Sequence, residues 1–233
     1  MIFGLDITSA IFWSAFGSIV LANIVLSGDN AVVIAMAART LKPEQQKKAI
    51  FWGSAAAIVM RIILTIVAIQ LLTLPYLKAV GAILLVYIGV DLLKSGDGEE
   101  GHGKEVSGML AAIRTILIAD LVMSLDNVLA VAAAAKGNVP LLVLGLVVSI
   151  PLIVFGATLL TKVMERFPII ITIGAALLGF LAGEMLLTDP AVTSQFGAMG
   201  EQTVTFAGAI GAVLVVFLGR ILQKKSNTTP AGA

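Results

Sequence analysis

Long apolar runs separated by short polar loops dominate the hydropathy pattern of this chain. Each run holds about 20 residues, the length at which an α-helix crosses the hydrocarbon core of a bilayer. The runs predict spans over about residues 10–38, 49–73, 76–93, 108–135, 139–162, 167–187 and 203–222. We expect Pro151 to interrupt the span at 139–162. Because the runs are continuously apolar rather than alternating, a transmembrane β-barrel is disfavoured. The pattern predicts an all-α polytopic membrane protein with seven transmembrane helices.

Composition agrees with this class. Of the 233 residues 59% are hydrophobic and 12% are charged, and the mean hydropathy is +1.05. A net charge of +1 gives no reason to expect a nucleic-acid partner. The chain contains no Cys, which excludes disulfides and thiolate metal sites. The first run carries no basic residue before Arg39, so we expect it to stay in the membrane rather than to be cleaved as a signal peptide.

One stretch of the chain is written twice. Residues 21–38, LANIVLSGDNAVVIAMAA, recur without a gap as residues 118–135, IADLVMSLDNVLAVAAAA. Each copy places a Ser-x-Asp-Asn tetrad inside an apolar run. A carboxylate within a span costs about 2.5–3.5 kcal/mol on insertion scales. Because this cost recurs at the same register, we expect a shared function for the two copies, with acids that merely hold helices together as the alternative.

The repeat continues into the third span of each half, where Asp91 aligns with Glu184. Three spans per half is an odd number, so the second half must enter the membrane from the opposite side, as in the inverted repeats of secondary transporters. The predicted organisation is a first three-helix repeat at 1–94, a polar cytoplasmic linker at 95–107, a second, inverted three-helix repeat at 108–187, an outer loop with the seventh helix at 188–223, and a disordered tail at 224–233.

Lys and Arg residues in the short loops predict the orientation. With the N-terminus outside, the inner side holds eleven of these residues and the outer side holds only Lys78 and Lys136. We therefore expect the N-terminus outside and the C-terminus in the cytoplasm.

The tetrads supply four candidate metal ligands: Asp29, Asn30, Asp126 and Asn127. Carboxylate and amide oxygens suit Mg²⁺, Ca²⁺ or Mn²⁺, whereas Zn²⁺ and Cu would call for Cys or His inside the membrane. Adjacent side chains on a regular helix point about 100° apart, so one ion reaches both only where the helix is distorted. Gly28 favours such a distortion in the first copy, and Leu125 takes its place in the second. We expect Asp29 and Asp126 to face each other near the bilayer midplane.

Four further polar residues recur as pairs. Asn23 corresponds to Asp120, six residues before the tetrad acid. Six residues of helix rise about 9 Å, so these two are ligands or relay groups only if the helix unwinds. Asp91 and Glu184 lie near the ends of their spans, where an acid can simply reach the interface. Because a helix C-terminus disfavours negative charge and the pair is repeated, we favour a role as gates or ligands.

Two further features carry charge. Arg61 lies in mid-span without a counterpart in the other half, and we expect the tetrad acids to neutralise it. Arg114 lies near the inner end of its span and is interpreted as structural. The linker residues Glu99, Glu100 and His102 offer a metal site, but a solvated acidic linker is the commoner interpretation.

The tetrads and the two-half layout resemble the TerC family of integral membrane proteins. The resemblance rests on Ser27-Gly28-Asp29-Asn30-Ala31 and Ser124-Leu125-Asp126-Asn127-Val128. It implies an exporter of metal ions in a bacterial inner membrane, with Mn²⁺ the cargo most associated with the family, and kinship with lysine-type amino-acid exporters. Ca²⁺ and Mg²⁺ stay open as cargo. We expect no prosthetic group and no enzymatic activity; the expected partners are the bilayer, the cation and protons, and a homo-oligomer stays open.

Rival functions are separated by the same residues. The alternative is an amino-acid or other small-cation exporter of this fold. An amino-acid exporter needs a site for a zwitterion, whereas the mid-span polar groups are mainly acids and amides. An intramembrane aspartyl protease is disfavoured because Leu26 stands where the first Gly of Gly-x-Gly-Asp belongs.

The spans hold up to five acids against one mid-span base, Arg61. Clustered carboxylates take up protons in a low dielectric, which predicts metal/proton antiport.

Overall fold

The computed structural model describes residues 8–25, 27–71, 74–94, 105–135 and 138–226, and within these ranges every regular element is an α-helix. The predicted all-α class is therefore confirmed. The helices are α1 (Ala10–Val25), α2 (Gly28–Ala38), α3 (Pro43–Leu71), α4 (Leu77–Lys94), α5 (Glu105–Ala135), α6 (Val139–Arg166), α7 (Ile169–Leu187), α8 (Pro190–Phe196) and α9 (Glu201–Ser226).

Five of the described helices, α3, α5, α6, α7 and α9, are long and apolar enough to cross a membrane. Helices α1 and α2 make a sixth span if the bent pair is counted as one. Helix α4 is not among these candidates, since it carries Lys78, Asp91 and Lys94 within its 18 residues. The protein is thus a multi-pass membrane protein with five or six candidate spans, and a seventh span across α4 stays a prediction.

The first tetrad interrupts a span, as its glycine predicts. Helix α1 ends at Val25, α2 begins at Gly28, and the two axes differ by 47°. A Cβ atom added to Gly28 would meet nothing within 4 Å, so the space around this position is open. The second tetrad lies inside α5, which is helical throughout Glu105–Ala135. The two copies therefore share a sequence pattern but not a backbone geometry.

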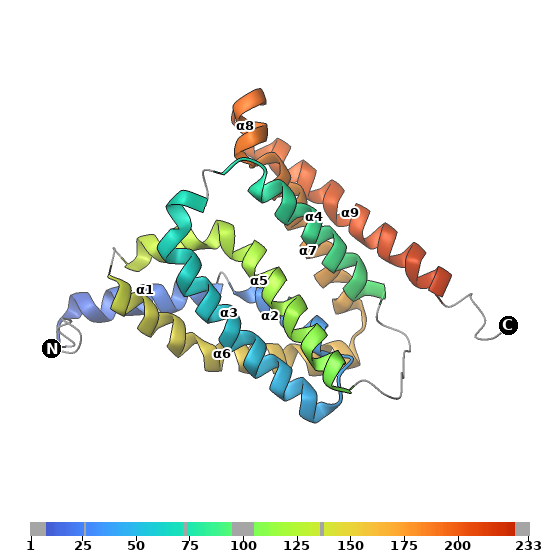
Figure 1. Cartoon of the computed structure of the whole chain (residues 1–233), viewed down its shortest axis with the longest axis horizontal. Coiled ribbons are helices and arrows are strands. Elements are labelled where there is room, and N and C mark those ends of the chain that lie inside the picture. The colour runs from blue at the N-terminus through green and yellow to red at the C-terminus, as the bar shows by residue number, and fades with distance from the viewer. Residues whose placement is uncertain (1–7, 26, 72–73, 95–104, 136–137, 227–233) are drawn as a thin grey trace.

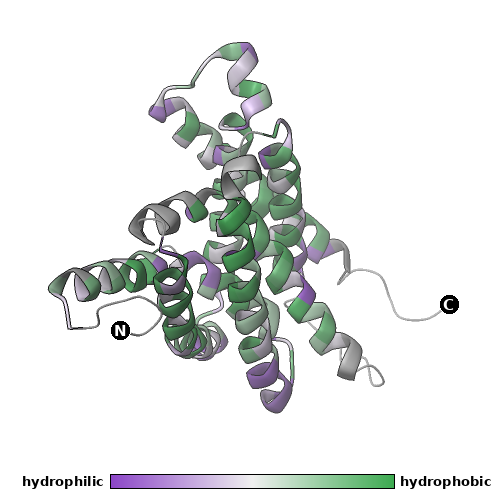
Figure 2. Cartoon of the chain, turned by 60° about the vertical axis from the view of Figure 1, so that its left-hand side comes forward, coloured by the Kyte–Doolittle hydropathy of each residue, from purple (hydrophilic) through white to green (hydrophobic). Residues whose placement is uncertain are grey.

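The helices form two groups; in Figure 1, α4, α7 and α9 lie to the upper right of α5, and α3 and α6 lie to its lower left. Helices α4, α7 and α9 pack together, and α1, α2, α3, α5 and α6 make the second group. Contacts between α4 and α5 and between α2 and α7 join the groups. Apolar residues cover the long helices in Figure 2, while polar residues gather mainly toward helix ends and loops. Large exposed side chains such as Phe155 and Phe206 then face lipid.

Glycines allow α7 and α9 to approach closely. A Cβ atom on Gly179 would collide with the carbonyl oxygen of Gly211, and one on Gly183 would collide with the carbonyl oxygen of Ala207. Small residues are the usual means by which membrane helices bring their backbones together, because lipid supplies no hydrophobic force between helices.

The structure differs from the sequence prediction at three places. Helix α6 continues through Pro151 and is not interrupted there. The predicted outer loop contains the short helix α8, which begins after the capping residue Asp189. Helix α9 extends to Ser226, beyond the expected start of a disordered tail at 224. Most of the predicted linker, including Glu99, Glu100 and His102, lies outside the described residues.

Candidate functional site

Buried polar side chains gather where the first span is broken. Asn23 on α1, Ser27 at the break, Arg61 on α3, and Asp120 and Ser124 on α5 are all buried. We call these five residues the Arg61 cluster. They come from three spans that are far apart in sequence, so tertiary packing alone assembles them.

The guanidinium of Arg61 is the centre of the cluster. Its Nε donates to Ser124 Oγ at 3.0 Å, and its Nη1 donates to Asn23 Oδ1 at 2.7 Å and to Ser27 Oγ at 2.8 Å. Its Nη2 donates to Asp120 Oδ1 in a buried ion pair. We expected a tetrad acid to form the ion pair with Arg61, and this is wrong: the carboxylate comes from Asp120. The tetrads contribute their serine hydroxyls instead.

The two repeat copies contribute equivalent atoms to this cluster. Ser27 Oγ donates to Asn23 Oδ1 at 3.3 Å, and Ser124 Oγ donates to Asp120 Oδ2 at the same distance. Each hydrogen bond joins a tetrad serine to the residue four positions earlier, in corresponding positions of the repeat. Arg61 thus lies between two matching hydroxyl–acceptor pairs, one neutral and one charged.

Asp29 and Asn30 follow directly at the first turn of α2. Asp29 is half-buried, and its Oδ1 accepts a hydrogen bond from the backbone N–H of Asn30 at 2.8 Å. A helix N-terminus favours a carboxylate in this position. Only Gly28 separates Asp29 from Ser27, whose hydroxyl accepts a hydrogen bond from Arg61, so Asp29 follows directly on the Arg61 cluster along the chain.

The amide of Asn30 is the unusual group at this turn. Its side chain is 2% exposed, yet neither Oδ1 nor Nδ2 has a hydrogen-bond partner among the described residues. Buried polar atoms without partners are rare in native proteins, and each one calls for an explanation such as a missing ion or water. A cation bound beside Asp29 would satisfy the amide oxygen.

The structure does not gather all predicted ligands into one shell. Asn127 is half-buried, and the side chain of Asp126 lies outside the described residues, so its expected approach to Asp29 stays a prediction. Among the described residues no three His, Cys, Asp or Glu side chains could hold one metal ion. The ligand set inferred from the sequence is therefore neither confirmed nor excluded.

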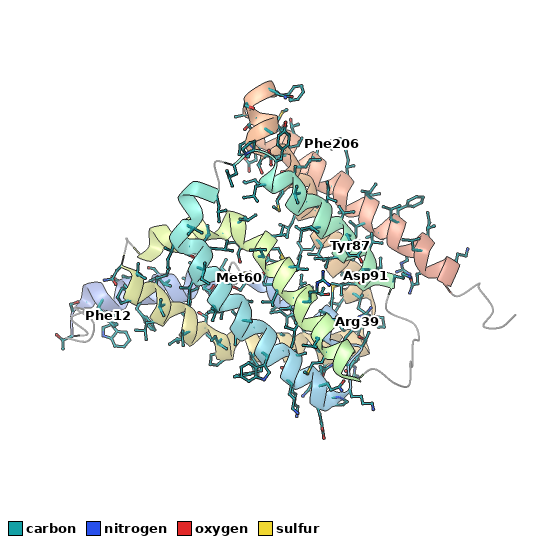
Figure 3. The ribbon with its side chains drawn as sticks, in the orientation of Figure 1. Phe12, Arg39, Met60, Tyr87, Asp91 and Phe206 are labelled. Atoms are coloured by element: carbon teal, nitrogen blue, oxygen red, sulfur yellow. The ribbon has the colours of Figure 1, made fainter. Side chains whose placement is uncertain are left out.

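The repeated acids near the span ends lie in different settings. Asp91 is exposed near the C-terminal end of α4, and Glu184 is half-buried on α7. Figure 3 shows Asp91 well separated from Met60, the residue that precedes Arg61. Asp91 therefore lies apart from the Arg61 cluster, and its role as a gate or a ligand stays a prediction.

Sequence reasoning missed the role of Asp189. This side chain is fully buried, and its carboxylate accepts hydrogen bonds from the backbone N–H groups of Tyr76 at 2.9 Å, Ala79 at 3.0 Å and Ala191 at 2.7 Å. Burial alone would raise the pKa of Asp189, but these backbone donors outweigh it and lower the pKa below its ordinary value. Asp before Pro190 is a helix-start signal for α8, but nothing local shows that it also holds the start of α4.

Comparison with known proteins places the chain among integral membrane proteins. The family described as "Integral membrane protein TerC family" matches residues 8–227. The uncharacterized membrane protein YjbE of Bacillus subtilis (strain 168) is 46% identical over 167 residues, which cover 72% of this chain and 76% of YjbE. The uncharacterized membrane protein YceF of the same organism is 26% identical over 230 residues, covering 95% of this chain and 87% of YceF.

A longer relative is named by its location. The UPF0053 inner membrane protein YoaE of Escherichia coli (strain K12) is 26% identical over 180 residues, which cover 69% of this chain but 35% of YoaE. No solved structure matches the chain.

Proposed function

Because the chain belongs to the TerC family of integral membrane proteins, we propose that it is a transporter of the bacterial inner membrane that exports a divalent metal cation, with Mn²⁺ the favoured cargo. The observation that carries this proposal is the pairing of Asp29 with Asn30 at a broken span. A half-buried carboxylate lies next to a fully buried amide that has no partner among the described residues. Hard oxygen donors of this kind suit Mn²⁺, Mg²⁺ or Ca²⁺.

The helix break is the feature that makes a binding role for Asp29 and Asn30 reasonable. Transporters commonly bind substrate where a discontinuous helix exposes polar groups near the membrane centre. Here the break lies between Val25 and Gly28, directly before Asp29 and Asn30. Asp126 and Asn127 are proposed as the second half of the ligand set. Asp91 and Glu184 are proposed as gates at the two ends of the transport path.

The proposed architecture is a pair of inverted three-helix repeats. In this proposal the α1–α2 pair corresponds to α5, α3 corresponds to α6, and α4 corresponds to α7. The packing supports it, because the α1–α2 pair contacts α6 as α5 contacts α3, and α4 contacts α7. Exchange of the two halves leaves this set of contacts unchanged. Seven spans with the N-terminus outside and the C-terminus in the cytoplasm complete the proposal.

Proton antiport is the proposed driving mechanism. Asp120 is neutralised by Arg61, so Asp29 is the described acid of this region without such an ion pair, and a second repeat acid, Asp126, is expected nearby. Acids that lose a bound cation in a low dielectric take up protons instead. Metal release on one side would therefore be followed by proton uptake on the same groups.

Flux measurements in proteoliposomes test the function. Wild-type protein should move Mn²⁺ into vesicles loaded with a metal-quenched dye, and an imposed pH gradient should drive this flux. Asp29→Asn should abolish it, whereas Glu165→Gln, an acid-to-amide change at an exposed position of α6, should leave it unchanged. Transport of a basic amino acid with no Mn²⁺ flux would refute the proposal in favour of the alternative exporter.

A further inference from the structure

Arg61 is a charged side chain held entirely inside the membrane part of the protein. It is 2% exposed and lies near the middle of α3. A guanidinium in a membrane interior is costly and persists where partners compensate its charge, usually at a functional position. Its four hydrogen bonds reach both halves of the chain through Asn23, Ser27, Asp120 and Ser124.

The atoms around the guanidinium are those of a cation site. They are the hydroxyl oxygens of Ser27 and Ser124, the amide oxygen of Asn23 and a carboxylate oxygen of Asp120. Hard cations prefer oxygen ligands of these kinds. In this structure the cation that they surround is the side chain of Arg61 itself. Asp29 and Asn30 lie on the turn that follows Ser27, so a metal bound to them would sit close to the same charge.

The charges of Arg61 and of a bound metal favour competition between the two cations. Arg61 with Asp120 is neutral as a pair, and Asp29 adds one negative charge. A divalent cation at Asp29 would bring two positive charges close to a buried guanidinium, and like charges in a low dielectric repel. The repulsion falls if the metal gains Asp120 while Arg61 moves away, or if Arg61 returns to Asp120 and the metal leaves.

We infer that Arg61 is a positioning residue that alternates with the transported cation for Asp120 and the surrounding oxygens, so that its return expels the metal. This inference rests on the proposed function, because it assigns a step of cation export to a residue that does not bind the cation. It differs from a structural role, in which Arg61 would only hold α1, α3 and α5 together.

The two roles predict opposite effects on metal affinity. Arg61→Gln keeps a planar hydrogen-bonding group but removes the charge. If Arg61 competes with the metal, this variant should bind Mn²⁺ roughly tenfold to a hundredfold more tightly and export it more slowly, so that KM and kcat fall together. If Arg61 is only structural, binding should weaken or stay the same. Arg61→Lys retains the charge and should keep an affinity near that of wild type.

The measurement is Mn²⁺ binding by titration calorimetry on purified protein in detergent, paired with flux in proteoliposomes. Arg114→Gln, at an exposed arginine of α5, is the matched control and should change neither quantity. Tighter binding with slower export in Arg61→Gln supports the inference. Equal or weaker binding in that variant overturns it.

A double variant keeps the test available if Arg61→Gln does not fold. Arg61→Gln with Asp120→Asn replaces the ion pair by a neutral hydrogen-bonding pair of similar shape. It should still bind Mn²⁺ but turn over at least about tenfold more slowly, because nothing displaces the metal. Turnover at the wild-type rate would overturn the inference. Failure of the wild-type protein to bind Mn²⁺ would instead refute the proposed function, so the two failures are distinguishable.

Discussion

Arg61 on α3 and Asp120 on α5 form a buried ion pair that joins the two halves of the chain. The pair lies beside the break in the first span, and the serines of both Ser-x-Asp-Asn tetrads complete the coordination of the guanidinium. The repeated motif therefore has two parts with different tasks. Its serines accept hydrogen bonds from Arg61, and its Asp-Asn dipeptide is the part that we propose binds the cation.

Breaking the ion pair from one side should destabilise the protein strongly. Asp120→Asn leaves a buried guanidinium without a countercharge, and loss of one partner from a buried pair costs about 3–5 kcal/mol. The drop should be visible as a lower midpoint of thermal unfolding in detergent. A variant in which Arg61→Met accompanies Asp120→Leu should recover most of the loss; if it is no more stable than Asp120→Asn, the unpaired charge is not the cause.

The two tetrad serines should matter about equally. Ser27→Ala and Ser124→Ala each remove one hydrogen bond to a charged donor, which is worth about 1.5–3 kcal/mol. Ser54→Ala is the control, because the buried Ser54 hydroxyl has no hydrogen-bond partner among the described residues and its removal should be neutral or stabilising. Free energies of unfolding that are large for one tetrad serine and negligible for the other would contradict the equivalence of the two copies in this cluster.

The contact between α7 and α9 should not accept a larger residue. Gly183→Ala places a Cβ atom against the carbonyl of Ala207, so the helices must separate and the folded protein should lose stability. Gly156→Ala on α6 meets nothing within 4 Å and should instead gain roughly 0.5–1 kcal/mol from helix propensity. Opposite shifts in the unfolding midpoint are expected, and equal shifts would rule out the close approach.

Asp189 should make stability depend on acid pH. Its pKa is lowered in the folded state by backbone N–H donors, so the carboxylate contributes stability above its ordinary pKa of 3.8. That contribution is lost as the pH falls through the lower, folded-state value. Asp189→Asn should remove this part of the acid dependence and lower the unfolding midpoint at pH 7. Unfolding curves of both proteins from pH 7 down to strongly acidic pH provide the check; parallel curves would contradict the assignment.

The sequence predicted the elements better than the contacts between them. Long apolar runs predicted the positions of the long helices, and Gly28 predicted the break between α1 and α2, because both follow from local chemistry. For the second copy, Leu125 in place of Gly28 made a break less certain without excluding it, and α5 is unbroken there. Pro151 was expected to interrupt its helix but does not, since neighbouring helices and side chains can replace the lost hydrogen bond inside a membrane protein.

Partner choice is where sequence reasoning failed. The tetrad acids were taken as the partners of Arg61, whereas the ion pair uses Asp120, because sequence position does not say which helix faces which. Asp189 was assigned to a loop, yet it caps α8 and holds the start of α4 across more than a hundred residues of chain. Both errors concern long-range contacts, which no local pattern encodes.

The account depends most directly on where a metal ion binds. Crystals of the protein soaked in Mn²⁺ and measured for anomalous scattering would locate it without reference to transport. The account predicts an anomalous peak within coordination distance of the Asp29 carboxylate and the Asn30 amide oxygen, and loss of that peak in Asp29→Asn. A peak confined to other acids, with none at Asp29 in protein that transports Mn²⁺, would contradict it.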